Sequence, residues 1–163
     1  MLRISSLKWR QSGVLFCTAV IVVTIDQITK FFVRSNMDLS ESIPAEGRFR
    51  LTYSTNSGSI FGLSLDATFL LVMAPVIIMA ILWLYFYYLP PSSRFLRCGL
   101  GLLLGGAIGN LIDRFRAGEV TDFIDIRLWG DFHWAAFNVA DAAITAGIVM
   151  VIYYLIHELR SQP

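Results

Sequence analysis

Two short motifs in the chain repeat the same pair of side chains, an asparagine followed three residues later by an aspartate. They are Asn110-Leu-Ile-Asp113 and Asn138-Val-Ala-Asp141. Residues three apart lie on one face of a helix, so each amide can hydrogen-bond and orient the carboxylate beside it. Two carboxylates paired in a site of low dielectric cannot both ionise easily, and one keeps its proton. Such a pair can hydrolyse a bond, because one carboxylate activates water and the other protonates the leaving group.

Structural interpretations of these charged residues also remain open. Asp113 is followed directly by Arg114, and an ion pair at a helix end would explain Asp113 alone. Asp141 could join neighbouring helices by hydrogen bonds without any catalytic role. Asp26 and Lys30 are four residues apart, a spacing that favours a structural ion pair on one helix face. The repeated asparagine–aspartate pattern is what favours catalysis for Asp113 and Asp141.

The composition indicates the surroundings in which these side chains must be placed. Hydrophobic residues make up 56% of the 163 residues and charged residues 15%, and the mean hydropathy is +0.64. Soluble domains have about 45–50% apolar and about 25% charged residues. The 13 basic residues are balanced by 12 acidic ones, so no nucleic-acid partner is expected. We expect a single integral membrane domain over residues 1–163.

Four long apolar runs with few charges are each predicted to be a transmembrane helix. The runs cover about 13–33, 67–89, 95–113 and 134–157. A helix needs roughly 20 apolar residues to cross the hydrocarbon core of a bilayer. The predicted fold class is therefore an all-α membrane protein with four transmembrane helices, whose extracytoplasmic segments are 34–66 and 114–133.

The distribution of charge predicts how these helices are oriented. The N-terminal tail and the 90–97 link carry basic residues and no acidic ones, whereas acidic residues outnumber basic ones in the two longer connecting segments. Basic loops are retained in the cytoplasm. We therefore expect both termini in the cytoplasm, and Asp26, Asp113 and Asp141 near the outer face of the membrane.

The two outer segments each contain a stretch in which apolar and polar residues alternate. These stretches are residues 48–54 and residues 123–129. Strict alternation is typical of a strand with one buried face. The sequence therefore predicts a small β-rich sheet or flap that rests on the outer surface of the membrane.

A stripe of glycines runs along the third predicted helix. Gly101, Gly105 and Gly109 are spaced by four residues and so lie on one face. Small residues at this spacing let a neighbouring helix approach closely. We expect the stripe to bring the third helix against the fourth and Asp113 towards Asp141.

Five blocks of sequence, in order along the chain, resemble one known family. They are Asp26-Gln27-Ile-Thr-Lys30; Asn56-Ser-Gly58-Ser-Ile-Phe61-Gly62; Gly105-Gly106-Ala107-Ile-Gly109-Asn110-Leu-Ile-Asp113-Arg114; Val120-Thr-Asp122-Phe123-Ile-Asp125; and Phe137-Asn138-Val-Ala140-Asp141. The chain resembles the lipoprotein signal peptidases, also called signal peptidase II. Ser59 and Ile60 stand where the family commonly has two small residues, often alanines.

The resemblance implies an aspartic endopeptidase in the inner membrane of a bacterial cell. Such enzymes remove the signal peptide from prolipoproteins, cutting before a cysteine that carries diacylglycerol. The matching catalytic dyad would be Asp113 and Asp141. The matching substrate-binding or supporting residues would be Asn56, Asn110, Arg114, Asn138, Asp26, Lys30, Gly58 and Asp122. The family uses no metal or organic cofactor, contacts membrane lipids and is inhibited by globomycin, and we expect a monomer.

Three rival functions remain open from the residues alone. Ionisable groups within a membrane could also form the relay of a small transporter or proton-translocating subunit. A scaffold whose aspartates only hold helices together is a second alternative. A serine protease would have to use Ser57 or Ser59 with His133, and no third group is evident for it. Absence of a polar trail to the cytoplasm argues against the transporter.

Overall fold

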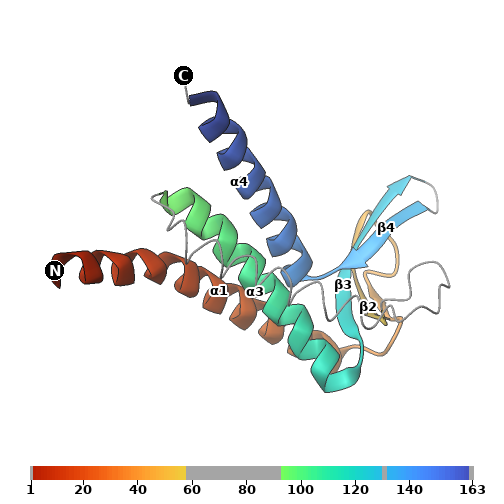
Figure 1. Ribbon diagram of the computed structural model, residues 1–163. Coiled ribbons are helices and arrows are strands. Elements are labelled where there is room, and N and C mark those ends of the chain that lie inside the picture. Colours follow the sequence, from red (N-terminus) through yellow and green to blue (C-terminus); the bar gives the residue numbers. More distant parts are fainter. Residues whose placement is uncertain (1, 58–92, 130–131, 162–163) are drawn as a thin grey trace.

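The computed structural model describes residues 2–57, 93–129 and 132–161. Helices and strands follow one another along the chain in the order α1 (Leu2–Asn36), β1 (Ser42–Ile43), β2 (Phe49–Asn56), α3 (Arg94–Ala117), β3 (Val120–Trp129), β4 (Phe132–Phe137) and α4 (Val139–Ser161). The helices converge at one end, where the sheet begins (Figure 1). The polar site lies at this junction.

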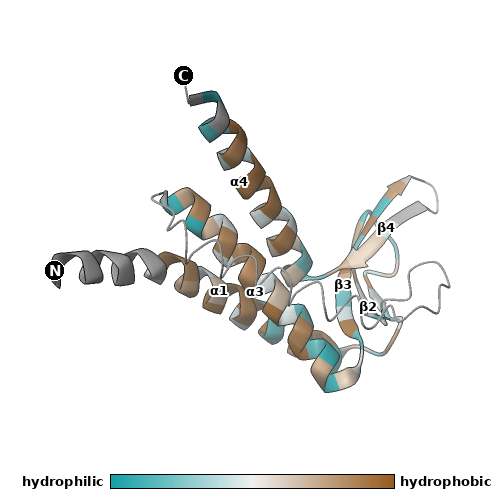
Figure 2. Cartoon of the chain, in the orientation of Figure 1, coloured by the Kyte–Doolittle hydropathy of each residue, from teal (hydrophilic) through white to brown (hydrophobic). Residues whose placement is uncertain are grey.

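Three of the described helices are long and apolar enough to cross a membrane. The candidate spans are Gly13–Asn36, Arg94–Ala117 and Val139–Glu158. The helices predicted over 13–33 and 95–113 are confirmed within α1 and α3, which extend further at both ends. Hydrophobic residues, coloured brown, make up most of the length of α4 (Figure 2). The helix predicted over 67–89 lies outside the described residues.

The predicted start of the last helix at Trp134 is wrong. Phe132–Phe137 forms β4 instead, and α4 begins only at Val139. This apolar stretch is extended because it pairs with β3, with Ile126 opposite Trp134. Hydropathy alone does not separate an apolar strand from the first turns of a membrane helix.

The strands form one antiparallel sheet in the order β1-β2-β3-β4. Figure 1 labels β2, β3 and β4 of this sheet. The predicted strands over 48–54 and 123–129 are confirmed within β2 and β3, but the polar residues take the buried side. Asp125 is only 5% exposed and accepts hydrogen bonds from Arg50 and Thr52 on β2. Phe49 is 73% exposed. A buried carboxylate needs such partners, so the register places β2 polar groups beside it.

Helix α3 packs between α1 and α4, and its glycines face both neighbours. A Cβ on Gly105 would lie 2.8 Å from the Ala19 carbonyl oxygen of α1. A Cβ on Gly106 would collide with the Ala140 carbonyl of α4. The expectation that the stripe Gly101–Gly105–Gly109 packs on the last helix therefore needs correction, because Gly101 and Gly105 press against α1.

Candidate active site

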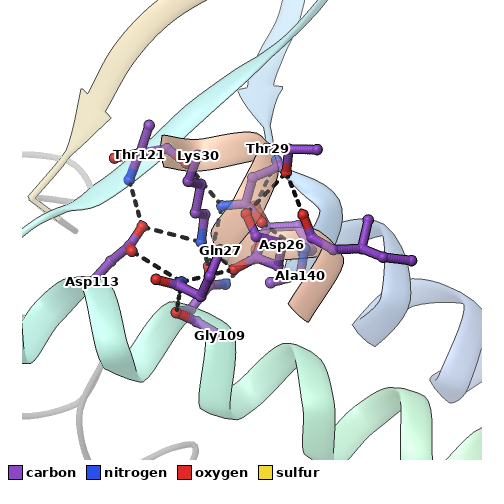
Figure 3. A network of polar contacts seen from close by, with 12 residues as sticks. Asp26, Gln27, Thr29, Lys30, Gly109, Asp113, Thr121 and Ala140 are labelled. Carbon is purple, nitrogen blue, oxygen red and sulfur yellow. Dashed lines mark hydrogen bonds and ion pairs between the residues drawn. The ribbon is translucent and has the colours of Figure 1, made fainter. Parts of the chain in front are cut away.

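A buried lysine lies at the centre of the polar cluster drawn in Figure 3. The Lys30 ammonium lies 2.9 Å from Asp26 Oδ2 and 3.1 Å from Asp113 Oδ2, and it donates a hydrogen bond of 3.0 Å to Asn110 Oδ1. The side chain is fully buried. An ammonium has three N–H donors, and here each has an acceptor. Lys30 therefore connects α1 to two positions of α3.

Asp113 is surrounded by donors and cations. Arg34 Nη1 lies 3.4 Å from Oδ1, and Gln27 Nε2 donates to the same oxygen at 3.2 Å. The backbone N–H of Thr121 donates to Oδ2 at 3.1 Å. Together with Lys30, these contacts let the Asp113 side chain fasten β3 and α1 to α3.

Asp26 joins the first helix to the last. Its Oδ1 accepts a hydrogen bond of 3.0 Å from the backbone N–H of Ala140, in the first turn of α4. A Cβ added to Gly109 would lie 2.6 Å from Asp26 Oδ2, so only glycine leaves room for this carboxylate. The structural ion pair expected for Asp26 and Lys30 is confirmed.

The second asparagine–aspartate motif is the N-terminal cap of α4. Asn138 Oδ1 accepts from the backbone N–H of Asp141 at 3.0 Å, and Asp141 Oδ2 accepts from the backbone N–H of Asn138 at 3.2 Å. This reciprocal pair is a capping box. Asn110 Nδ2 donates to the other oxygen, Asp141 Oδ1, at 2.7 Å. Both carboxylate oxygens of Asp141 are therefore held in place.

Asp122 on β3 lies on the other side of Asn138. Asn138 Nδ2 lies 2.7 Å from Asp122 Oδ1, and it is also within hydrogen-bond distance of the Thr121 carbonyl and Asn110 Oδ1. Asn138 thus contacts the Asp122 side chain through its amide nitrogen. It contacts Asp141 through the two reciprocal hydrogen bonds of the helix cap. The two carboxylates share one asparagine between them.

The environment of Asp122 favours its protonated form. Burial raises the pKa of Asp122, the negative charge of Asp141 raises it further, and hydrogen bonds from Asn138 and Asn56 lower it, so that the pKa reaches about 6. The Arg114 guanidinium on α3 interacts electrostatically with Asp141, Asp122 and Asp113. A carboxyl that can hold a proton near neutral pH, beside a second carboxylate, is suited to acid–base chemistry.

The residues predicted for the site divide into two groups in the structure. One group surrounds Asp141 and Asp122, and the other surrounds Lys30, Asp26 and Asp113; Asn110 belongs to both. Gly58 lies outside the described residues. Each asparagine amide was expected to orient the carboxylate of its own aspartate. Asn138 instead holds the Asp141 carboxylate through its backbone N–H, while its side-chain oxygen accepts from the Asp141 backbone. Asn110 instead reaches Asp141 on another helix.

Sequence reasoning missed two members of the buried cluster. Gln27 bridges Asp26 Oδ2, at 3.1 Å, and Asp113, and Arg34 completes the charge balance of Asp113. The spacing Asp26, Lys30, Arg34 on α1 is a signal that could have found the arginine, because residues four apart share a helix face. Within the described ranges, no three His, Cys, Asp or Glu side chains form a group that could hold a metal ion.

Comparison with known proteins identifies the family. A family model described as signal peptidase (SPase) II matches residues 18–157. The lipoprotein signal peptidase of Moorella thermoacetica is 42% identical over 139 residues, covering 85% of this chain and 89% of the relative. That of Desulforapulum autotrophicum is 43% identical over 145 residues, covering 85% and 88%.

Two solved structures share the fold. Both are described as bacterial membrane enzymes determined by the in meso method, at 2.3 Å and 1.9 Å. Their TM-scores are 0.81 and 0.79 at 30% and 31% identity, and they cover 93% and 88% of this chain and 92% of each matched chain. The matched residues include the whole polar site, and the chain therefore belongs to the signal peptidase II family, a family of membrane proteases.

Proposed function

We propose that this protein removes the signal peptide from diacylglyceryl-modified bacterial prolipoproteins, cutting before the lipidated cysteine. Membership of the signal peptidase II family and relatives named lipoprotein signal peptidase support this activity. The polar site at the end of apolar helices suits a substrate that is itself a membrane helix with acyl chains at its cleavage end. Prolipoproteins and the surrounding membrane lipids are the partners proposed.

The acid–base pair proposed here is Asp141 with Asp122, in place of the pair of Asp141 with Asp113 expected from the sequence. The single observation that carries the choice is the contrast in partners. Asp113 faces the cations of Lys30 and Arg34. Asp122 shares Asn138 with Asp141, whose negative charge raises the pKa of Asp122. A carboxylate neutralised by cations is a poor proton donor, whereas one beside a like charge readily keeps a proton.

Hydrolysis then follows the chemistry of an aspartic protease. One carboxylate of the pair removes a proton from a water molecule, whose oxygen attacks the carbonyl carbon before the lipidated cysteine. The other carboxyl donates its proton to the leaving amide nitrogen, and the carbon–nitrogen bond breaks. The positive charge of Arg114 offsets the negative charge of the pair.

The decisive experiment compares three isosteric variants of the purified full-length protein. Asp122→Asn and Asp141→Asn should each abolish cleavage of a diacylglyceryl-modified prolipoprotein, whereas Asp113→Asn should keep measurable activity. Globomycin should block the wild-type reaction. Cleavage by Asp122→Asn at the wild-type rate would indicate that Asp113, and not Asp122, is the acid–base partner of Asp141. Undiminished activity in all three variants would favour a scaffold function for the aspartates.

The proposed orientation has both termini in the cytoplasm and the acid–base pair near the outer face. Glu46 is exposed in the segment between β1 and β2, so a cysteine there can be labelled. In a background without Cys17 and Cys98, Glu46→Cys should react with a membrane-impermeant reagent added outside. A reporter fused after Pro163 should report the cytoplasm. Inverted labelling would exclude a role in processing lipoproteins on the outer side.

A further inference from the structure

The two carboxylates of the proposed pair have unequal surroundings. Asp141 lies in the first turn of α4, where backbone N–H groups and the helix dipole favour a negative charge. It accepts hydrogen bonds from the Asn138 backbone and from Asn110 Nδ2, one on each oxygen. Asp122 is buried on a strand, which supplies no such dipole. The difference points to separate roles for the two groups.

The orientation of the Asn110 amide is fixed by its neighbours. Its oxygen accepts from the Lys30 ammonium at 3.0 Å and from Asn138 Nδ2 at 3.1 Å. The reversed amide would point its own NH₂ group at both donors. The NH₂ group must therefore face Asp141, as the 2.7 Å distance to Oδ1 indicates.

We propose that Asn110 is a positioning residue that makes Asp141 the general base of the pair and leaves Asp122 as the general acid. The inference rests on the function proposed above. The ammonium of Lys30 draws electron density towards the Asn110 oxygen, so the amide N–H groups become stronger donors to Asp141. Lys30 thus acts on Asp141 from α1 through a residue of α3.

The proton balance follows from these roles. Asp141 takes one proton from the attacking water, and Asp122 gives its own proton to the amide nitrogen as the carbon–nitrogen bond breaks. A proton then passes from Asp141 to Asp122 through the next water molecule, which restores the starting state. No oxidant, reductant or other reactant is required.

The other charged groups around the pair leave this asymmetry in place. Arg114 on α3 interacts with both carboxylates and more strongly with Asp141, so its charge acts in the same direction as the asymmetry. Asp113 and Asp26 are paired with Lys30, and Asp113 also with Arg34, so their charges are compensated. The hydrogen bond from Asn110 is donated to Asp141 and not to Asp122.

A titration of the wild-type protein tests the assignment without any substitution at Asn110. Carboxyl ¹³C signals of labelled aspartates would be followed in detergent, with Asp122→Asn and Asp141→Asn used only to assign them. Across pH values on either side of 6, the moving signal should be that of Asp122. If Asp141 takes up the proton first, the assignment is overturned.

The role of Asn110 is tested by Asn110→Leu, with Asn36→Leu as the matched control. Asn36 is an exposed residue of α1 whose side chain donates a hydrogen bond to the Phe32 carbonyl of its own helix. Asn110→Leu should lower kcat about 10- to 100-fold, the size of a lost hydrogen bond to a charged group. KM should change by less than about threefold, since the effect lies in the chemical step.

The pH profile separates positioning from mere loss of structure. Without the Asn110 donor, the base ionises less readily, so the acidic limb of the activity profile should move to higher pH. A damaged fold would lower activity equally at every pH, and an unmoved limb would overturn the proposal. Full activity of both Asp122→Asn and Asp141→Asn would instead show that the proposed pair is not catalytic.

Discussion

The two asparagine–aspartate motifs have the same spacing but different structures. Asn110 and Asp113 lie within α3, and their side chains reach different partners. Asn138 and Asp141 begin α4 and cap it reciprocally. Equal spacing therefore does not give equal geometry, because a motif inside a helix has its backbone N–H groups already bonded and one at the start does not.

The difference extends from geometry to charge. The motif of α3 ends in a carboxylate neutralised by Lys30 and Arg34, which suits a structural role. The motif of α4 ends in a carboxylate beside Asp122 and Arg114. Asp113 holds the helices together, and Asp141 is the aspartate for which we propose a catalytic role.

The largest effect is expected from exchanging each motif's aspartate for asparagine. Asp141→Asn should abolish cleavage and lower the free energy of unfolding less than Asp113→Asn does, because it loses one of two accepted hydrogen bonds and leaves no buried cation short of a partner. Asp113→Asn should lower the free energy of unfolding by about 3–5 kcal/mol, because it leaves buried Lys30 with less compensation. Activity assays and thermal unfolding in detergent would measure both. Equal losses of stability in the two variants would contradict the contrast drawn here.

A smaller effect should separate the two tasks of Asn138. Asn138→Ala removes the cap of α4 and the donor to Asp122, so we expect a loss of about 0.5–2 kcal/mol in stability together with reduced activity. Asn138→Ser can still cap the helix, so only activity should fall. Matching unfolding temperatures for Asn138→Ala and wild type would show that the cap contributes nothing.

The smallest expected effect is a change in the titration of Asp122. The charge of Asp141 contributes to raising the pKa of Asp122 to about 6. Asp141→Asn removes that charge, so the pKa of Asp122 should fall, and the carboxyl should lose its proton at lower pH. Carboxyl NMR would measure the shift. Asp113→Asn is the control, and a pKa that does not fall in Asp141→Asn would place the two carboxylates out of electrostatic contact.

Much of the fold was predictable because it depends on patterns along the chain. Apolar length predicted α1 and α3, and alternation predicted β2 and β3. The last helix was predicted to start at Trp134, which lies in β4, because an apolar strand and an apolar helix have similar hydropathy.

The site was less predictable because it depends on contacts across the chain. Residue type and spacing identified the asparagine–aspartate motifs and the pair of Asp26 and Lys30, whereas Asp122 was expected only from the family resemblance. The partner of each aspartate could not be predicted from the sequence, because the hydrogen bond from Asn110 to Asp141 joins positions 31 residues apart. Asp122 has no asparagine three residues before it, and its significance follows only from the pairing of β3 with its neighbours.

The hydrogen bond from Ala140 to Asp26 joins positions 114 residues apart, so it can form only after the last helix has been synthesised. When α1 enters the membrane during synthesis, Lys30 already has Asp26 as a neighbour on the same helix, which lowers the cost of inserting both charges. Asp141 and its cap arrive only with the last helix. In the proposed function, hydrolytic capability therefore begins only when the final span is inserted.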